Sequence, residues 1–329
     1  MMTATPAVDD DLDILVEAAP RSLPLTRPGD TVTVSHTEHL RVTHIHPAAA
    51  GTRTYPFAVL TLHDMGLNAA SAFSTLFAVS SASTPSSALH AADVYHVDVL
   101  GAQDDAPPIP ASDPWVSLTD LGAEVAALAA SLRASTPGLR RFVLVASGSG
   151  CHIAVEAALT LRSAVAGMIL FSPVLTGAGA ADGVRERLSA LGGWNGTGEG
   201  AKGGWLARWL SPDAAAANVE LAAKYADALD RVCGANVGRY VWADARRRDV
   251  GAALAAAPRG SVGGRVLLFG GRAATGVGAY AAVVEGLAAW PPGAASLIGV
   301  EGAGAAVVEE APHEVVEAVR LFFMGLGCV

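Results

Sequence analysis

Cysteine and lysine are scarce in this chain. Its 329 residues include three cysteines, Cys151, Cys233 and Cys328, and only two lysines, Lys202 and Lys224. An odd number of widely spaced cysteines argues against a disulfide framework and favours reduced thiols, as in the cytoplasm. The shortage of lysine is a matter of overall composition and carries no functional weight.

Long apolar runs and a net positive charge are also missing. No uncharged apolar run reaches the roughly 18–20 residues that a membrane-spanning helix needs. The net charge of −9 argues against a nucleic-acid or anionic-membrane surface as partner. Residues 1–30 hold an acidic run followed by prolines, without the basic and apolar regions of a signal peptide. We therefore expect a cytoplasmic protein with no integral membrane segment and no nucleic-acid partner, whose residues 1–30 form an N-terminal arm.

What is present is an alternation of short apolar strands with amphipathic helices. Strand-like runs lie at 31–35, 40–46, 57–63, 92–98, 142–145, 166–172, 265–270 and 295–300. Helical patterns lie at 69–79, 118–132 and 151–161, and two more begin at 278 and 312. This alternation predicts an α/β fold with a mostly parallel sheet of about eight strands and helices on both faces.

The segment 141–154, RFVLVASGSGCHIA, carries the most informative local pattern. A strand, a turn of small residues and an apolar helix are the context of the nucleophile elbow, G-x-S-x-G, of α/β-hydrolases. Alignment on the end of the strand places Gly148 at the nucleophile position, with Ser147 and Ser149 on either side. Glycine has no side chain to attack a carbonyl, and it adopts the positive φ of such a turn without steric strain.

The alternation is interrupted in the second half of the chain. It stops after Val174 and resumes at Arg265, and helical patterns between them run from Trp205 to about Ala257. α/β-Hydrolases carry a helical cap at this place in the fold. We predict a hydrolase-like core at 31–175 and 259–329 and a helical cap at 176–258, with 192–204 as a glycine-rich connector.

The other two positions of a catalytic triad are also inert. A hydrolase of this plan has an acid after a late strand and a histidine after the last strand. The residues that fall there are Ala273 and Ala305. Gly148, Ala273 and Ala305 are therefore predicted to be vestigial triad positions, and we expect no enzyme activity.

The predicted oxyanion region has an unfavourable charge. One backbone donor would come from Ser149 and the other from the loop that begins His63-Asp64-Met65. A carboxylate at Asp64 would oppose a developing oxyanion, and loss of a single donor already costs about 3–4 kcal/mol in barrier. His63, Asp64, Met65 and Ser149 are therefore predicted to line a vestigial pocket.

Two other readings of this region stay open. A register shift would make Ser149 or Ser147 the nucleophile of a weak serine esterase, and a further shift would select Cys151. A pocket that has lost its chemistry could still bind an apolar small molecule as a sensor.

Neither a metal nor a cofactor is expected. His44 and His46 share one face of a strand and His36 is near, but no acid or cysteine completes a ligand set in the sequence pattern. Gly148-Ser149-Gly150 lacks the third glycine of a dinucleotide-binding loop. We interpret the histidines as residues of a surface strand.

Six segments, taken in order, resemble the NDR (N-myc downstream-regulated) family, an α/β-hydrolase-like group considered non-catalytic. The six segments are VLTLHDMGLN (59–68), YHVDVLGAQDDA (95–106), ASGSGCHI (146–153), NVELAAKY (218–225), NVGRYVWADARRRDV (236–250) and FFMGLGC (322–328). The resemblance identifies as family-signature residues Gly66, Asn68, His96, Asp98, Asn218, Asn236, Arg247, Arg248 and Asp249. In character the chain is most similar to plant and algal members.

The resemblance implies a function. The family is implicated in signalling, growth and stress responses through protein partners, and its plant members are similar to partners of heterotrimeric G-protein β subunits. By resemblance, the chain is therefore expected to be a non-catalytic adaptor protein.

Overall fold

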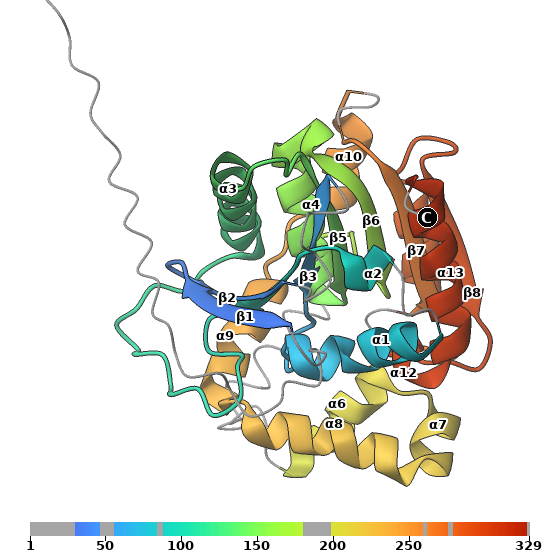
Figure 1. Ribbon diagram of the computed structural model, residues 1–329. Coiled ribbons are helices and arrows are strands. Elements are labelled where there is room, and N and C mark those ends of the chain that lie inside the picture. The colour runs from blue at the N-terminus through green and yellow to red at the C-terminus, as the bar shows by residue number, and fades with distance from the viewer. Residues whose placement is uncertain are drawn as a thin grey trace, which may run out of the picture.

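The computed structural model describes residues 30–46, 56–83, 88–179, 199–258, 262–275 and 279–327 (Figure 1). The expected N-terminal arm, apart from Asp30, lies outside these residues, as do positions 192–198 of the expected connector and Cys328. No described helix combines the length and the hydropathy that a membrane span requires.

One eight-stranded sheet forms the centre of the molecule, with the strand order β1-β2-β4-β3-β5-β6-β7-β8. The strands are β1 (Thr31–His36), β2 (Leu40–His46), β3 (Phe57–Leu62), β4 (Val94–Val99), β5 (Arg141–Ser147), β6 (Val165–Phe171), β7 (Arg265–Gly271) and β8 (Ala295–Val300). β2 pairs antiparallel with β1 and β4, and all other neighbours are parallel. The predicted mostly parallel α/β sheet is confirmed.

Burial explains which strands form the centre. Every residue of β3 and β6 is buried, because parallel strands covered on both faces read as continuous apolar runs. β1 alternates exposed and partly buried residues, as an edge strand that faces solvent does. The functional loops follow the carboxyl ends of the central strands β3 and β5.

Helices cover both faces of the sheet. The core helices are α1 (Ala69–Ser83), α2 (Ala88–Ala91), α3 (Leu118–Ser135), α4 (Ser149–Leu161), α11 (Tyr280–Leu287), α12 (Val307–Glu310) and α13 (Pro312–Gly325), with a 3₁₀ turn η1 (Arg162–Ala164) after α4. α3 packs against α4, and α1 packs against α13 (Figure 1). In α13, Val315, Val319 and Phe323 are buried, as the apolar spacing predicts.

Five described helices separate β6 from β7. They are α6 (Glu199–Trp209), α7 (Pro212–Ala217), α8 (Val219–Arg231), α9 (Gly234–Asp244) and α10 (Val250–Ala256). α6, α7 and α8 lie together at the bottom of Figure 1, beneath α1 and α12, whereas α10 lies beside α4. The division of the chain into core and cap segments stays a prediction.

The glycine-rich connector was predicted too long. Residues 199–204 belong to α6, which begins at Glu199, six residues before the predicted helical region at Trp205. Glycine disfavours helix by about 1 kcal/mol per residue, but α6 buries Trp205 and Trp209, whose rings stack at 5.3 Å. Tertiary packing of these two side chains outweighs the weak helix propensity of the residues before them.

Candidate functional site

The turn between β5 and α4 has the backbone shape of a nucleophile elbow. Gly148 has φ 53° and ψ −122°, a conformation that side chains rarely adopt, and its N–H donates to the carbonyl of Phe171 at 2.9 Å. Gly150, two residues later, approaches β3 so closely that an added Cβ would lie 2.4 Å from the carbonyl oxygen of Leu62. The two glycines therefore let the helix start tightly against the sheet.

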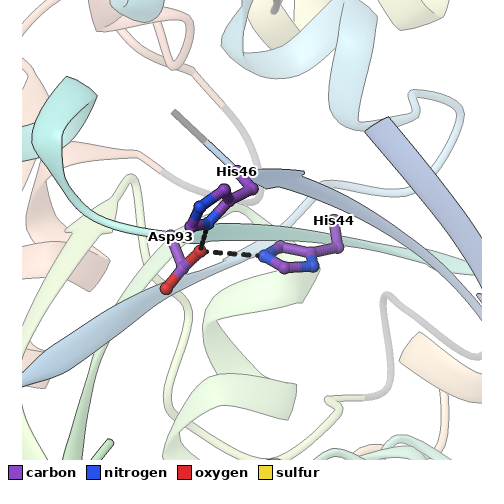
Figure 2. Close-up of side chains that lie close together, drawn as sticks. All are labelled: His44, His46 and Asp93. Carbon is purple, nitrogen blue, oxygen red and sulfur yellow. Dashed lines mark hydrogen bonds and ion pairs between the residues drawn. The ribbon is translucent and has the colours of Figure 1, made fainter. Parts of the chain in front are cut away.

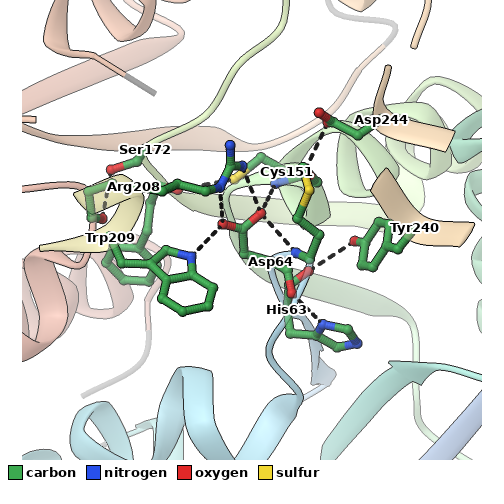
Figure 3. Close-up of polar contacts among 12 residues, drawn as sticks. His63, Asp64, Cys151, Ser172, Arg208, Trp209, Tyr240 and Asp244 are labelled. Atoms are coloured by element: carbon green, nitrogen blue, oxygen red, sulfur yellow. Dashed lines mark hydrogen bonds and ion pairs between the residues drawn. The ribbon is translucent and has the colours of Figure 1, made fainter. Parts of the chain in front are cut away.

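A carboxylate fills the space in front of this turn. A Cβ at Gly148 would lie 2.1 Å from Cγ of Asp64, far inside van der Waals contact. Asp64 Oδ1 accepts the backbone N–H of Ser149 at 2.8 Å and the backbone N–H of Met65 at 2.9 Å (Figure 3). Ser149 and the loop after β3 are the expected sources of the two oxyanion-hole donors. Both donors are thus directed at a carboxylate of the protein itself.

The charge of Asp64 is balanced by the C-terminal end of α6. Arg208 donates to Oδ1 at 3.2 Å and to Oδ2 at 3.3 Å, and the indole N–H of Trp209 donates to Oδ2 at 3.1 Å (Figure 3). Burial alone would raise the pKa of Asp64, but the guanidinium of Arg208 and the N–H groups of Ser149 and Trp209 outweigh it, so that the pKa is lowered. Asp64 is therefore a buried, ionised carboxylate with five donors directed at it.

Little space is left beside the elbow. The cavity that remains has a volume of about 20 Å³, enough for about one water molecule. Ligand pockets commonly measure about 300–1,000 Å³. Its walls combine residues of the elbow and the neighbouring loops with side chains of α6 and α8: Asp64, Ser147, Gly148, Ser172, Arg208, Trp209, Tyr225 and Ala305.

The nucleophile candidates of the alternative reading have other roles. Ser149 is buried and its hydroxyl donates to Oδ1 of Asp244 in α9 at 2.8 Å. Cys151 is buried and its thiol contacts the carbonyl of Phe171 at 3.4 Å, and burial raises its pKa well above the usual range for a thiol. Ser147 is half-buried and lines the small cavity. Within the described residues, no hydrogen bond joins Ser147 or Ser149 to a histidine.

The predicted acid and base positions lie in loops that follow the expected strands. Ala273 comes two residues after β7, and its N–H donates to the carbonyl of Ala303 at 2.9 Å. Ala305 follows β8 and lines the cavity at the elbow, and its carbonyl accepts the hydroxyl of Ser172 at 2.8 Å. Both positions are held by backbone contacts, and neither methyl group can take part in proton transfer.

One predicted pocket residue and two signature residues of the core hold the loop after β3 in place. His63, from the predicted pocket, accepts the N–H of Val99 at Nε2 and donates from Nδ1 to the carbonyl of Asp64 at 2.8 Å, which is the tautomer that both bonds require. Asn68 caps α1 by accepting the N–H of Ser71, and Asp98 accepts the N–H of Ala69 at 2.7 Å. These contacts fix the entry into α1 and with it the position of Asp64.

The remaining core signature residues are also enclosed. His96 contacts Thr61 at 2.7 Å, and burial lowers its pKa to about 3. Gly66 has φ 78°, and an added Cβ there would lie 3.3 Å from the ring of Trp209. Both residues therefore serve packing close to the elbow.

The signature residues of the inserted helices hold these helices on the core. Asn218 and Asp249 cap α8 and α10. Asn236 accepts the N–H of Ile109 and donates to the carbonyls of Gly101 and Pro107, which fastens α9 to the loop after β4. Arg247 pairs with Asp244 at 3.0 Å, and Arg248 forms two hydrogen bonds with Glu156 of α4.

Ion pairs along α8 differ from those that the spacing predicts. The sequence places Glu220 four residues before Lys224 and Asp227 four residues before Arg231. In the structure Lys224 pairs instead with Glu309 at 2.9 Å, and Arg231 with Asp104 at 3.1 Å. The cations reach acids on the core because α8 lies beside α1 and α12 at Lys224 and beside the loop after β4 at Arg231. Spacing along one helix does not reveal this proximity.

Sequence reasoning missed three residues of the site: Arg208, Trp209 and Asp244. No local motif distinguishes Arg208 from the other arginines of the inserted helices, and a tryptophan four residues after Trp205 indicates packing of a helix face and not a hydrogen bond to a distant acid. A buried acid predicted at Asp64 does require a cation or several donors nearby. That requirement was the only available signal, and it does not say which segment supplies them.

The prediction about surface histidines also needs correction. The sequence pattern showed no acid to complete a ligand set with His44 and His46, but Asp93, next to the start of β4, lies within hydrogen-bond distance of both rings. The acid was missed because it comes from another strand, 47 residues or more along the chain.

Comparison with known proteins agrees with this architecture. The model of the Ndr family matches residues 41–329. No curated protein matches the sequence. The fold resembles that of a thermophilic esterase from Thermogutta terrifontis, with a TM-score of 0.67 and 16% identity over 90% of this chain and 98% of the other.

Two further structures have the same fold. The enol-lactonase from Burkholderia xenovorans LB400 gives a TM-score of 0.68 at 14% identity, over 87% of this chain and 97% of the other. A hydrolase from Pseudomonas aeruginosa PA01 gives 0.65 at 18% identity, over 91% and 99%. At such identities these likenesses establish the α/β-hydrolase fold and nothing about chemistry.

Proposed function

Because the chain belongs to the Ndr family, we propose that it is a non-catalytic protein of the α/β-hydrolase fold that acts as an intracellular adaptor. In this proposal it serves signalling, stress or growth responses through contacts with other proteins. The observation that best supports the loss of catalysis concerns the carboxylate of Asp64. It accepts hydrogen bonds, at 2.8 and 2.9 Å, from the two N–H groups at the expected oxyanion-hole positions.

Three features of the site support the loss of catalysis. Gly148 offers no nucleophile, and Asp64 occupies the space into which a side chain there would project. Ala273 and Ala305 offer neither an acid nor a base. The negative charge of Asp64 would repel the oxyanion of a tetrahedral intermediate, where a hydrolase places only positive dipoles.

The weak esterase with Ser149 or Ser147 is the second candidate. Ser147 favours it, because it is half-buried and lines the residual cavity. Ser149 does not, because its hydroxyl donates to the carboxylate of Asp244, itself paired with Arg247. The small-molecule sensor finds little support at the elbow, since about 20 Å³ does not admit an apolar ligand larger than water.

We expect no covalent labelling of the purified chain by a fluorophosphonate probe and no hydrolysis of p-nitrophenyl esters above the level of the Ser147→Ala, Ser149→Ala double variant. Intact mass spectrometry and ester turnover measure the two outcomes. The Thermogutta terrifontis esterase serves as the positive control. Stoichiometric labelling at Ser147 or Ser149 that the double variant abolishes would establish the esterase instead.

The adaptor role is tested by direct binding. By family resemblance, we expect a purified G-protein β subunit, with its γ subunit, to bind the immobilised chain saturably with a Kd of about 1 μM or tighter. The Thermogutta terrifontis esterase is the matched bait, because it shares the fold at only 16% sequence identity. Equal signal on both baits would remove this partner from the proposal while leaving the labelling result untouched.

A further inference from the structure

Two histidines and an aspartate meet at one end of the antiparallel pair β2–β4, away from the elbow. Asp93 Oδ1 lies 3.0 Å from Nε2 of His44 and 2.6 Å from Nδ1 of His46 (Figure 2). All three ligand-type atoms lie within 4.8 Å of one another. Among the described residues, no other group of three such side chains has this proximity.

The register of the strands produces this meeting. His44 lies opposite Tyr95 and Ile45 opposite Val94, so that His46 comes to the level of Asp93 just before β4 begins. His44 and His46 are two residues apart and therefore point to the same face of β2. The cluster is a product of sheet pairing, with both histidines on β2 and Asp93 directly before β4.

The supporting contacts orient the cluster. The ring of His44 stacks on Tyr95, with centroids 4.2 Å apart and planes 12° from parallel. The side chain of Asp93 is only 3% exposed, whereas those of His44 and His46 are 27% and 43% exposed. The carboxylate is therefore held inside, and the imidazoles close over it from the solvent side.

We propose that His44, His46 and Asp93 form a binding site for a divalent transition-metal ion of the zinc type. Two imidazole nitrogens and one carboxylate oxygen are a ligand set that Zn²⁺ takes in three-ligand sites with a fourth, open position. Because His46 is the most exposed of the three, the open position faces solvent and would hold water.

The geometry requires only a small adjustment to accept the ion. Ligand atoms about 2.0–2.1 Å from a tetrahedral zinc ion lie roughly 3.4 Å from one another. The present distances of 2.6 and 3.0 Å are those of hydrogen bonds, so each nitrogen–oxygen distance must lengthen by less than about 1 Å. The two ring nitrogens, at most 4.8 Å apart, must come to a similar separation, and both imidazoles are partly exposed, whereas Asp93 is enclosed.

Metal binding is tested on the untagged full chain, since a polyhistidine tag would bind the same ions. We expect Zn²⁺ to raise the thermal unfolding midpoint and to bind with one-to-one stoichiometry in calorimetry. Co²⁺ should give the visible absorption of a four-coordinate nitrogen and oxygen site, which Zn²⁺ displaces.

Three variants localise the site. His44→Phe keeps a ring to stack on Tyr95, and Asp93→Asn keeps the shape of the acid. Each of these two variants, and likewise His46→Ala, is expected to weaken Zn²⁺ binding by more than about tenfold. His36→Ala on β1 is the matched control and should bind as the unchanged chain does. The apo midpoint of each variant shows whether it folds.

Two results would overturn the proposal. One is Zn²⁺ affinity that is unchanged in folded His44→Phe and His46→Ala variants, which would place the ion elsewhere. The other is the absence of any Co²⁺ spectrum or Zn²⁺-dependent shift in the unchanged chain, which would leave the cluster as a hydrogen-bonded brace between β2 and β4.

Discussion

Replacement of Gly148 by serine, which restores the nucleophile of the motif, is expected to destabilise the protein by about 3–5 kcal/mol and to create no hydrolase activity. The new Cβ would lie 2.1 Å from Cγ of Asp64, and overpacking of this kind costs about 1–3 kcal/mol or more. The positive φ of 53° at this position adds about 1–3 kcal/mol for a residue other than glycine. Urea denaturation followed by circular dichroism measures the change.

A pair of control variants separates the causes of this loss. Gly148→Ala should cost about as much as Gly148→Ser, because the Cβ and not the hydroxyl makes the contact. Combination of Gly148→Ser with Asp64→Gly, which removes the opposing side chain, should be more stable than the sum of the two single changes predicts, by at least about 1 kcal/mol. A serine variant as stable as the unchanged chain would show that Asp64 does not occupy the elbow.

Replacement of Asp64 by asparagine is expected to cost about 3–5 kcal/mol at pH 7. Removal of one partner of a buried ion pair costs about 3–5 kcal/mol, and in this variant Arg208, 12% exposed, loses the carboxylate to which it donates two hydrogen bonds. The amide also presents an NH₂ group to a site in which every neighbour of Asp64 is a donor. Chemical denaturation at pH 7 measures the difference from the unchanged chain.

The same variant makes a prediction about pH. The pKa of Asp64 in the folded chain is below its ordinary value of 3.8. The ionised carboxylate therefore contributes stability that is fully present above about pH 4–5 and is lost as the pH falls below 3.8 through the folded pKa. The stability difference between the unchanged chain and Asp64→Asn should accordingly shrink as the pH falls from about 5 to below 3.8.

A matched variant tests whether the stability lost in Asp64→Asn arises from the charge of Arg208 or from a general change in packing. Arg208→Met in the Asp64→Asn background removes the cation that has lost the Asp64 carboxylate while keeping an apolar side chain of similar length. It should recover part of the stability lost by Asp64→Asn alone. A stability difference that stays constant across the acid range would show that the pKa of Asp64 is the same in the folded and the unfolded chain.

Composition and periodicity predicted the fold because both reflect which residues of each strand and helix become buried. The continuous apolar runs at 57–62 and 165–171 are strands covered on both faces. In α8, Leu221, Tyr225 and Leu229 recur every four residues, and all three are buried. The vacant position at Gly148 could likewise be identified, because an elbow is a local motif of strand, turn and helix. These features depend on residues that are neighbours along the chain.

Other features depend on segments that are distant along the chain. Arg208 reaches Asp64 across 144 positions, and Asp93 reaches His44 across 49. Lys224 pairs with Glu309 rather than with an acid on its own helix. No local pattern marks such partners, because any of several charged residues on the surface of a helix could be the one that packing brings near.

The sequence by itself thus indicated an α/β-hydrolase-like protein of the Ndr type, and it predicted Gly148, Ala273 and Ala305 at the positions of a triad. Only the tertiary structure decided what occupies the elbow: a buried carboxylate with two backbone donors on one oxygen and the end of α6 against it. The physical reason is that the absence of a side chain at one position can be read from the sequence alone. A buried carboxylate, in contrast, is stabilised by donors and a cation that tertiary packing brings together from several parts of the chain.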